Sequence, residues 1–428
     1  MHENQYAHQA QRAFLIGLEL PLRESDGWTA DESMDELERL VDTAGGVVVG
    51  RERQPRSKPD VATYVGSGKA REIEEIRRHE EFDMAVFDGE LTPTQQRNLE
   101  EIIGCQVLDR TAIILDIFAQ RARSREAMAQ VELAQLNYRL PRLTGKGVEL
   151  SRLGGGARGA IGIRGPGETK LEVDRRRIRE RISALREELE EIRAHRIRLR
   201  SDRAAGAVPV IALTGYTNAG KSTLHRALAG SDVLAEDRLF ATLDATTRRV
   251  EPADGEPYLL VDTVGFIHNL PTFLVAAFRS TLEEVNEADL LLHVVDASHP
   301  KRAEQMQTVV DVLTELGAGS RPTLVVYNKM DQVDPGDLDH LLRHTPDSVA
   351  VAAALGQNLD ALQQAIQNAL QNRRETVEVM IPYTRSSWLA WAHERGRVLR
   401  EEHQETGTLI KVELERGLAG RLKAGLER

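Results

Sequence analysis

The chain has 428 residues, 41% of them hydrophobic and 29% charged, with a formal net charge of −11. This length predicts two to four domains with sizeable cores, and the composition is that of a soluble globular protein. No stretch approaches about 18 uncharged apolar residues, and the first residues lack the apolar core of a signal peptide. Cys105 is the only cysteine, which excludes an intrachain disulfide and favours a reducing, cytoplasmic location.

Residues 1–110 predict a small α/β domain with mainly parallel strands. Short apolar runs at 14–20, 46–50, 84–87 and 105–108 alternate with helical patterns at 34–44, 69–79 and 93–103, as is typical of this class. Residues 65–69 (Val-Gly-Ser-Gly-Lys) resemble a fragment of a phosphate-binding loop. We favour a plain turn between strand and helix over an anion site, because the full spacing is missing.

Residues 111–203 predict a helical hairpin with a basic tip. Residues 113–140 read as one long helix with Leu133, Leu136 and Leu140 on one face, and residues 178–199 repeat Ile or Leu at steps of three and four. Between them, residues 145–167 contain nine glycines together with Arg152, Arg158 and Arg164. Two long helices that flank such a segment predict an antiparallel pair presenting a Gly/Arg-rich loop.

The charge of this segment points to an anionic partner. Residues 121–203 contain 21 Lys/Arg against 12 Asp/Glu, a local charge of +9 that leaves −20 on the remainder. Glycines let backbone amides approach phosphates, and arginines contact phosphates with two hydrogen bonds at once. We therefore favour RNA contact by Arg152, Arg158 and Arg164 over a plain linker between solvated, salt-bridged helices.

Residues 204–372 predict a doubly wound nucleotide-binding domain, with strands at 208–213, 258–261, 290–295 and 323–327. Residues 215–222 (Gly-Tyr-Thr-Asn-Ala-Gly-Lys-Ser) have phosphate-loop spacing and lie between a strand and a helix at 223–228. We expect Lys221 to bridge the β- and γ-phosphates and the Ser222 hydroxyl to ligate Mg²⁺. The nucleotide-contacting residues expected here are Gly215, Tyr216, Thr217, Asn218, Ala219, Gly220, Lys221, Ser222 and Thr223.

Two further segments are candidate switches. Asp262 would hold Mg²⁺ through a water molecule, and the Gly265 amide would meet the γ-phosphate. In the first switch, Thr242 is the best candidate to close on Mg²⁺, with Thr246 and Thr247 as rivals. We assign catalytic roles to Lys221, Thr242 and Gly265. The switch residues expected at the nucleotide are Phe240, Ala241, Thr242, Leu243, Asp244, Asp262, Thr263, Val264 and Gly265.

Residues 328–331 (Asn-Lys-Met-Asp) predict which base is bound. The Asp331 carboxylate can accept two hydrogen bonds from guanine, whereas adenine has no matching pair of donors, so the preference is for GTP. Lys329 would lie across the base and Asn328 would steady the phosphate loop. The remaining residues expected at the base are Met330, Ala352, Ala353 and Ala354, with the Ala353 amide closing the pocket.

Phe266 follows Gly265, at the position where many GTPases carry a glutamine that orients the attacking water. A phenyl ring cannot orient water by hydrogen bonding. We therefore expect slow intrinsic hydrolysis that a partner accelerates. The alternative, that Phe266 is simply a core residue, agrees with the same expectation.

With these motifs assembled, the chain resembles the HflX-type GTPases over nearly its whole length. The resemblance is carried by residues 109–123, 130–136 and 162–169, and by the phosphate-loop and switch segments 215–222, 240–244 and 262–267. It implies a cytoplasmic GTPase on the large ribosomal subunit whose hairpin loop reaches ribosomal RNA near the peptidyl-transferase centre, and it implies Thr242 as the switch residue on Mg²⁺. The chain departs from the family at Ala352, where a serine is usual.

The sequence thus predicts an α/β protein with four parts: an N-terminal α/β domain (1–110), a helical hairpin (111–203), a P-loop GTPase domain (204–372) and a small C-terminal α/β domain (373–428). In the last part, strands begin near 377 and 408 and a helix covers 387–399. We expect a monomeric, Mg²⁺-dependent GTPase that splits or rescues ribosomes under stress and is stimulated by them. The alternative is a GTP-gated, rRNA-binding assembly module whose hydrolysis is incidental.

Overall fold

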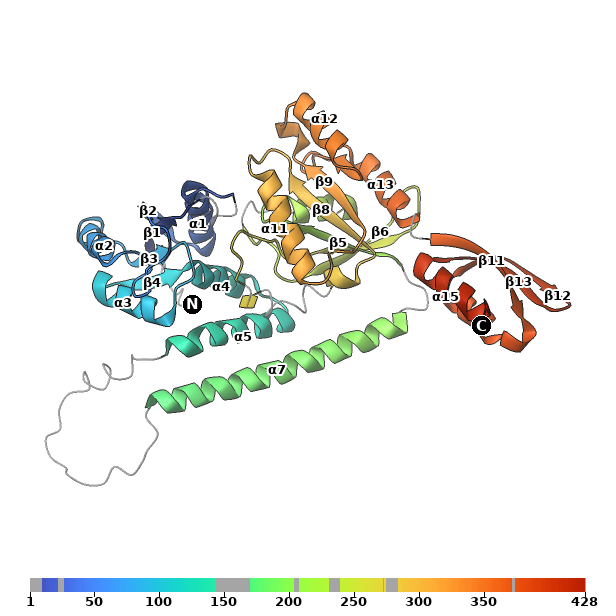
Figure 1. The fold of residues 1–428 in the computed structure, drawn as a ribbon, viewed down its shortest axis with the longest axis horizontal. Coiled ribbons are helices and arrows are strands. Elements are labelled where there is room, and N and C mark those ends of the chain that lie inside the picture. Colours follow the sequence, from blue (N-terminus) through green and yellow to red (C-terminus); the bar gives the residue numbers. More distant parts are fainter. Residues whose placement is uncertain are drawn as a thin grey trace, which may run out of the picture.

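The computed structural model describes residues 10–21, 27–143, 170–203, 208–230, 239–271, 273–274, 284–371 and 374–427. An N-terminal α/β unit, a helix pair, a central α/β unit and a C-terminal unit follow one another along the chain (Figure 1). The predicted α/β fold class is confirmed. In the described residues no helix is both long and apolar enough to cross a membrane.

The N-terminal unit is a four-stranded parallel sheet in the order β2-β1-β3-β4. Its predicted elements are confirmed to within a few residues. Thr29 and Thr92 begin helices with reciprocal capping boxes, which explains where those helices start. The bounds are β1 Arg12–Glu19, α1 Ala30–Ala44, β2 Val47–Pro55, α2 Ser67–Glu80, β3 Met84–Phe87, α3 Pro93–Ile103 and β4 Gln106–Asp109.

Residues 65–69 form a turn into α2, with Gly66 as the residue before the helix. The Lys69 amine lies 2.7 Å from a Glu52 oxygen and 2.8 Å from a Glu72 oxygen. Because two carboxylates already neutralise this amine, the turn interpretation holds and the segment offers no free cation to an anion.

The single long helix predicted over residues 113–140 was wrong. The structure divides it into α4 (Arg110–Arg121) and α5 (Arg125–Arg142). The Ser124 hydroxyl accepts a hydrogen bond from the Ala127 amide at 3.1 Å and so caps a new helix. The apolar spacing continues across the break, which is why periodicity alone missed it.

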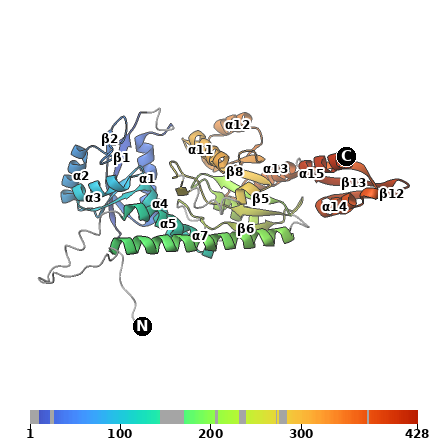
Figure 2. The same cartoon turned by 60° about the horizontal axis from the view of Figure 1, so that its bottom comes forward.

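Helix α5 packs antiparallel against α7 (Lys170–Arg203), as predicted. Two ion pairs fix the direction: Arg125 with Glu188 and Arg181 with Glu132, each at 2.6 Å. The predicted apolar faces meet between the helices, where Ala129, Leu133, Ile182 and Leu185 are buried and Leu136, Leu140, Ile178 and Leu189 flank them. In Figures 1 and 2, α7 runs along both the N-terminal and the central unit. Arg152, Arg158 and Arg164 lie outside the described residues.

The central unit contains a six-stranded sheet in the order β10-β9-β8-β5-β7-β6, parallel except for β6. The four strands predicted from apolar runs are β5, β7, β8 and β9. Ligands of such sheets bind at the carboxyl ends of the strands. The bounds are β5 Val210–Gly215, α8 Lys221–Ala229, β6 Thr246–Val250, β7 Tyr258–Asp262, β8 Leu290–Asp296, α11 Arg302–Glu315, β9 Thr323–Asn328, η3 Met330–Gln332, α12 Pro335–His344, β10 Ser348–Ala350 and α13 Leu359–Gln371.

The C-terminal unit is an antiparallel sheet, β11-β13-β12, with two helices. The helix predicted to reach residue 399 ends at Arg395, so its predicted end was wrong. Gly396 follows it and lies so close to β13 that a side chain there would meet Val412 and Leu414. The bounds are β11 Arg374–Pro382, η4 Tyr383–Arg385, α14 Ser387–Arg395, β12 Arg397–Gln404, β13 Gly407–Glu415 and α15 Arg416–Glu427.

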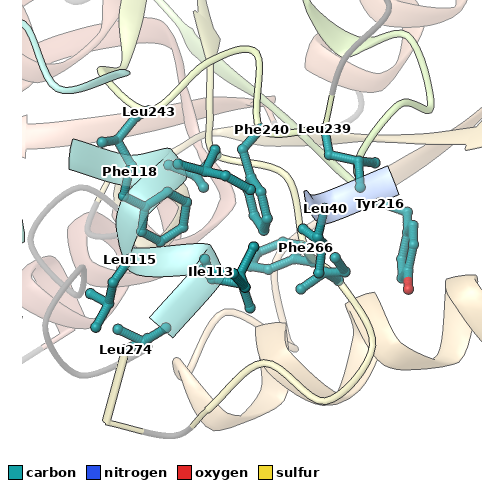
Figure 3. Close-up of a cluster of buried hydrophobic side chains, with 14 of the residues drawn as sticks. Leu40, Ile113, Leu115, Phe118, Tyr216, Leu239, Phe240, Leu243, Phe266 and Leu274 are labelled. Carbon is teal, nitrogen blue, oxygen red and sulfur yellow. The ribbon is translucent and has the colours of Figure 1, made fainter. Parts of the chain in front are cut away.

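One apolar core joins the N-terminal unit and α4 to the central unit (Figure 3). Phe240 and Phe266, which belong to the two predicted switch segments, lie inside it. Phe266 is only 1% exposed. Other members are Leu40, Ile113, Leu115 and Phe118 from the N-terminal side and Tyr216, Leu239, Leu243 and Leu274 from the central unit. Both switch segments are therefore packed against the N-terminal half of the chain.

Candidate functional site

The phosphate-loop segment connects β5 to α8, and its first and sixth residues must be glycine. Gly215 has a φ of +149°, and a Cβ there would lie 2.3 Å from the Val294 carbonyl oxygen. Gly220 has a φ of +93°, and a Cβ there would lie 2.1 Å from Asn328 Nδ2. Glycine at these two positions permits the backbone conformation in which the loop turns into the start of α8, and a helix N-terminus favours anions.

Lys221 lies buried in the middle of this loop. Its Nζ donates hydrogen bonds to the carbonyl oxygens of Gly215 at 3.1 Å and Tyr216 at 2.8 Å. Burial lowers the pKa of Lys221 to about 8, while the nearby charge of Asp262 opposes that shift. An amine desolvated in this way gains from any anion that enters the site.

Three residues predicted to serve a metal ion lie together. Ser222 Oγ is 2.7 Å from Thr242 Oγ1, which in turn donates to Asp262 Oδ2 at 2.8 Å. In the described part of the chain, buried Asp262 Oδ1 has no hydrogen-bond partner. Two hydroxyls and an unsatisfied carboxylate oxygen form the hard oxygen set that Mg²⁺ prefers, so the donor set fits that ion.

The two rival threonines lie outside this cluster of hydroxyls and carboxylate. Thr246 and Thr247 are exposed at the start of β6, and the Thr246 hydroxyl is 3.5 Å from the Asp244 carbonyl oxygen. Of the three candidates in this segment, Thr242 is the one whose hydroxyl reaches Ser222 and Asp262.

A cavity of about 470 Å³ joins the phosphate loop to both switch segments. Four arginines at its wall were not singled out from the sequence, since each reads there as an ordinary surface cation: Arg121, Arg123, Arg226 and Arg248. The rival candidate Thr246 also lines the cavity. The other predicted site residues that line it are Thr217, Asn218, Gly220, Lys221, Ser222, Thr223, Phe240, Ala241, Thr242, Leu243, Asp244, Asp262, Thr263 and Gly265.

The predicted base-binding segment is tied to the phosphate loop by Asn328. Its Nδ2 donates to the Ala219 carbonyl at 2.9 Å, and its Oδ1 accepts from the Ala353 amide at 3.0 Å. Lys329 has a φ of +60° and its amine lies 2.7 Å from Asp296 Oδ2, a partner that the sequence analysis missed. Asp331 is exposed in η3.

The remaining predicted residues of this region differ in burial. Ala352 and Ala353 are buried, whereas Ala354 is exposed. The Met330 amide donates to the Val351 carbonyl at 3.1 Å, which holds the two base-side segments together. Tyr216 and Val264 face the N-terminal unit within the shared apolar core and do not line the cavity.

The second switch segment, residues 262–268, is joined to the phosphate loop through its backbone. The Phe266 amide donates to the Gly215 carbonyl at 3.1 Å, and the Thr217 amide donates to the Phe266 carbonyl at 2.7 Å. The Phe266 ring itself is buried, so no polar side chain stands at that position.

A curled glycine loop at a helix start, a serine–threonine–aspartate cluster beside it and an Asn-Lys-Met-Asp segment tied to that loop define a P-loop GTPase domain. The chain is 47% identical over 397 residues to the GTPase HflX of Caldanaerobacter subterraneus subsp. tengcongensis, covering 92% of this chain and 90% of the relative. It is 49% identical over 376 residues to that of Alkalihalophilus pseudofirmus, covering 88% and 85%. The chain belongs to the HflX family of GTPases, and it is an enzyme that binds GTP and hydrolyses it.

Family models match three consecutive parts of the chain. They are described as GTP-binding GTPase N-terminal for residues 31–119, GTP-binding GTPase Middle Region for 121–203, and 50S ribosome-binding GTPase for 210–329. Among solved structures, the complex of SsGBP with GDP is 26% identical, with a TM-score of 0.48 over 85% of this chain and 99% of that one.

Proposed function

We propose that this GTPase acts in the cytoplasm on the large ribosomal subunit, and that in its GTP-bound form it splits or rescues ribosomes. The description of the family model that matches residues 210–329 supports a ribosomal partner. The observation that carries the proposal is the burial of Phe266 between the two halves of the chain. A site with a phenyl ring in place of a water-orienting amide hydrolyses GTP slowly until a partner reshapes it.

The proposed roles at the nucleotide follow from the chemistry of each side chain. Lys221 contacts the β- and γ-phosphates, and Ser222 and Thr242 ligate Mg²⁺ while Asp262 holds one of its waters. A Mg²⁺ ion bound there supplies charge neutralisation at the phosphates. The Gly265 amide contacts the γ-phosphate, and Asp331 recognises guanine.

The proposed RNA contact lies at the tip of the α5–α7 hairpin. The antiparallel helix pair supports a presenting role, because it is held by an apolar seam and two ion pairs. Arg152, Arg158 and Arg164 belong to the segment that connects the two helices. In this proposal the chain acts as a monomer, divided at about residues 110, 203 and 372, with 373–428 as an accessory unit.

The test measures dissociation of purified 70S particles with GTP, with a non-hydrolysable GTP analogue and with GDP. The proposal expects splitting with GTP and with the analogue but none with GDP, and no splitting by Lys221→Ala. Replacing Arg152, Arg158 and Arg164 by Gln should weaken ribosome binding and its salt dependence while leaving GTP affinity unchanged. Binding to precursor particles without any splitting would favour the assembly module instead.

A further inference from the structure

The first switch segment, residues 240–244, is held on one side of Thr242 by helix α4. The Phe240 ring packs edge-on against Phe118, with ring centroids 4.8 Å apart and planes at 82°. Phe240 is 2% exposed and has a φ of +51°. A left-handed backbone is costly for an aromatic residue and persists only where the surroundings enforce it. The packing on Phe118 thus holds the segment in a conformation that it would not adopt alone.

On the other side of Thr242, the segment is held by the start of helix α5. The Asp244 carboxylate accepts hydrogen bonds from the Arg123 amide at 2.8 Å and the Ser124 amide at 3.1 Å. It also accepts a hydrogen bond from the Ser124 hydroxyl. A carboxylate at a helix N-terminus is stabilised by the unpaired amides there and by the helix dipole.

Ser124 therefore serves two segments that lie 120 positions apart in the sequence. Its hydroxyl donates to Asp244 and accepts from the Ala127 amide at 3.1 Å, which caps α5. Helix α5 is one of the two helices of the hairpin. The cap of the hairpin and the position of the first switch are thus parts of one hydrogen-bonded group.

We propose that Asp244 and Ser124 are positioning residues that hold Thr242 at the metal cluster, so that the first switch closes and the α5 cap is completed in the same event. This inference rests on the proposed role of Thr242 as the switch residue. Thr242 hydrogen-bonds both Ser222 and Asp262 in the conformation in which Asp244 caps α5. A closed first switch is favoured by bound GTP and not by bound GDP. The identity of the bound nucleotide therefore affects the start of the hairpin through this contact.

Coupling of this kind works in both directions. A partner that fixes the start of α5 favours the closed switch and hence bound GTP, and bound GTP orders the start of α5. The Phe118–Phe240 contact adds a second anchor from the same junction between α4 and α5.

The test compares the affinities of Asp244→Ala for a non-hydrolysable GTP analogue and for GDP. We expect the analogue affinity to fall about tenfold, within the usual range of coupling between sites, while GDP affinity stays within about twofold. Ser124→Ala should likewise lose affinity for the analogue but not for GDP. Ser124→Thr keeps the hydroxyl and should bind the analogue as tightly as the wild type does. The two alanine changes combined should be no worse than either alone.

Thr92→Ala is the matched control. Thr92 caps α3 through the Gln95 amide at 3.2 Å, as Ser124 caps α5, and among the described residues it hydrogen-bonds no switch residue. Both affinities should be unchanged in this variant. If Asp244→Ala does not fold, Asp244→Asn replaces it, since it keeps one acceptor and loses the charge.

Hydrogen exchange provides an independent readout. In the wild type, the amides of Arg123, Ser124 and Ala127 should exchange more slowly with the analogue than with GDP, and Asp244→Ala should abolish that difference. If Asp244→Ala lowers the affinities for the analogue and for GDP equally, or lowers neither, the proposal is overturned. If Thr242→Ala also leaves analogue affinity unchanged, the role of Thr242 itself is wrong. If Thr242→Ala lowers the affinity for the analogue and Asp244→Ala does not, only the positioning role of Asp244 and Ser124 is wrong.

Discussion

The hydroxyl group of Tyr216, in the phosphate loop, donates a hydrogen bond to the Glu36 carboxylate of the N-terminal unit. The same oxygen accepts a hydrogen bond from the His268 amide at 2.6 Å. Glu36 also accepts from buried Arg110, whose other nitrogen lies 2.8 Å from Asp88 Oδ1. The phosphate loop, the second switch segment and the N-terminal unit therefore share one continuous buried polar network.

Tyr216→Phe should remove this link while keeping the ring and its stacking on Trp28. The Glu36 carboxylate and the His268 amide each lose a buried partner, so we expect a loss of about 1–3 kcal/mol in the free energy of unfolding. Chemical denaturation measures it. Nucleotide-induced protection of α1 from hydrogen exchange should also disappear.

Tyr327→Phe is the control for that variant, because its hydroxyl bonds Thr345 at 2.7 Å inside the central unit. It should lose stability but keep the protection of α1. If the two variants behave alike, the Tyr216 hydroxyl does not connect the units.

Arg110→Met should be severely destabilising. Arg110 is 2% exposed and neutralises both Glu36 and Asp88. Removing one partner of a buried ion pair leaves uncompensated charge and costs about 3–5 kcal/mol. Adding Glu36→Gln and Asp88→Asn should recover most of that loss. Arg51→Met, which removes an exposed pair with Asp35, should cost little, and a similar small loss for Arg110→Met would contradict the account.

His268 should make the protein less stable in mild acid. Burial, aided by the charge of Arg110, lowers the pKa of His268 to about 4. At a pH below about 6.5, His268 is protonated in the unfolded chain but stays neutral in the folded protein. The free energy of unfolding therefore falls as pH drops from 6.5 towards 4. Between pH 7.5 and 5 this residue should contribute about 2 kcal/mol of that loss.

Denaturation of wild type and His268→Phe at both pH values measures this contribution. The substitution should remove it without losing a side-chain hydrogen bond, because the His268 ring nitrogens have no partner among the described residues. An identical pH dependence in the two proteins would show that His268 is not held neutral.

Asp331→Asn should change the base preference of the site from guanine to xanthine. The asparagine amide donates a hydrogen bond where guanine also donates, whereas xanthine presents a carbonyl oxygen at that position. One of the two charge-assisted hydrogen bonds is lost and the other becomes a neutral one, so GTP affinity should fall about a hundredfold, and affinity for xanthosine triphosphate should rise. Competition binding measures both. An unchanged preference for GTP over ATP would count against the role of Asp331.

Most of the parallel strands could be predicted because each is a short apolar run bounded by polar turns, as in β3 and β8. The parallel strand β10 was missed, since it has only three residues. Strand β12 could not, since its sequence Arg-Val-Leu-Arg-Glu-Glu-His-Gln has no apolar face that alternates. The residues expected at the phosphates were found from local spacing. The contact of Tyr216 with Glu36 joins positions 180 residues apart, and nothing local in either segment indicates its partner.

The most direct test of the proposed function is the steady-state rate of GTP hydrolysis at saturating GTP, measured with and without purified large ribosomal subunits. Lys221→Ala serves as the blank. The account predicts slow hydrolysis by the protein alone and a rate at least about tenfold higher with the subunits, because a partner must supply what Phe266 cannot. Fast hydrolysis by the protein alone, or a rate that the subunits leave unchanged, would contradict it.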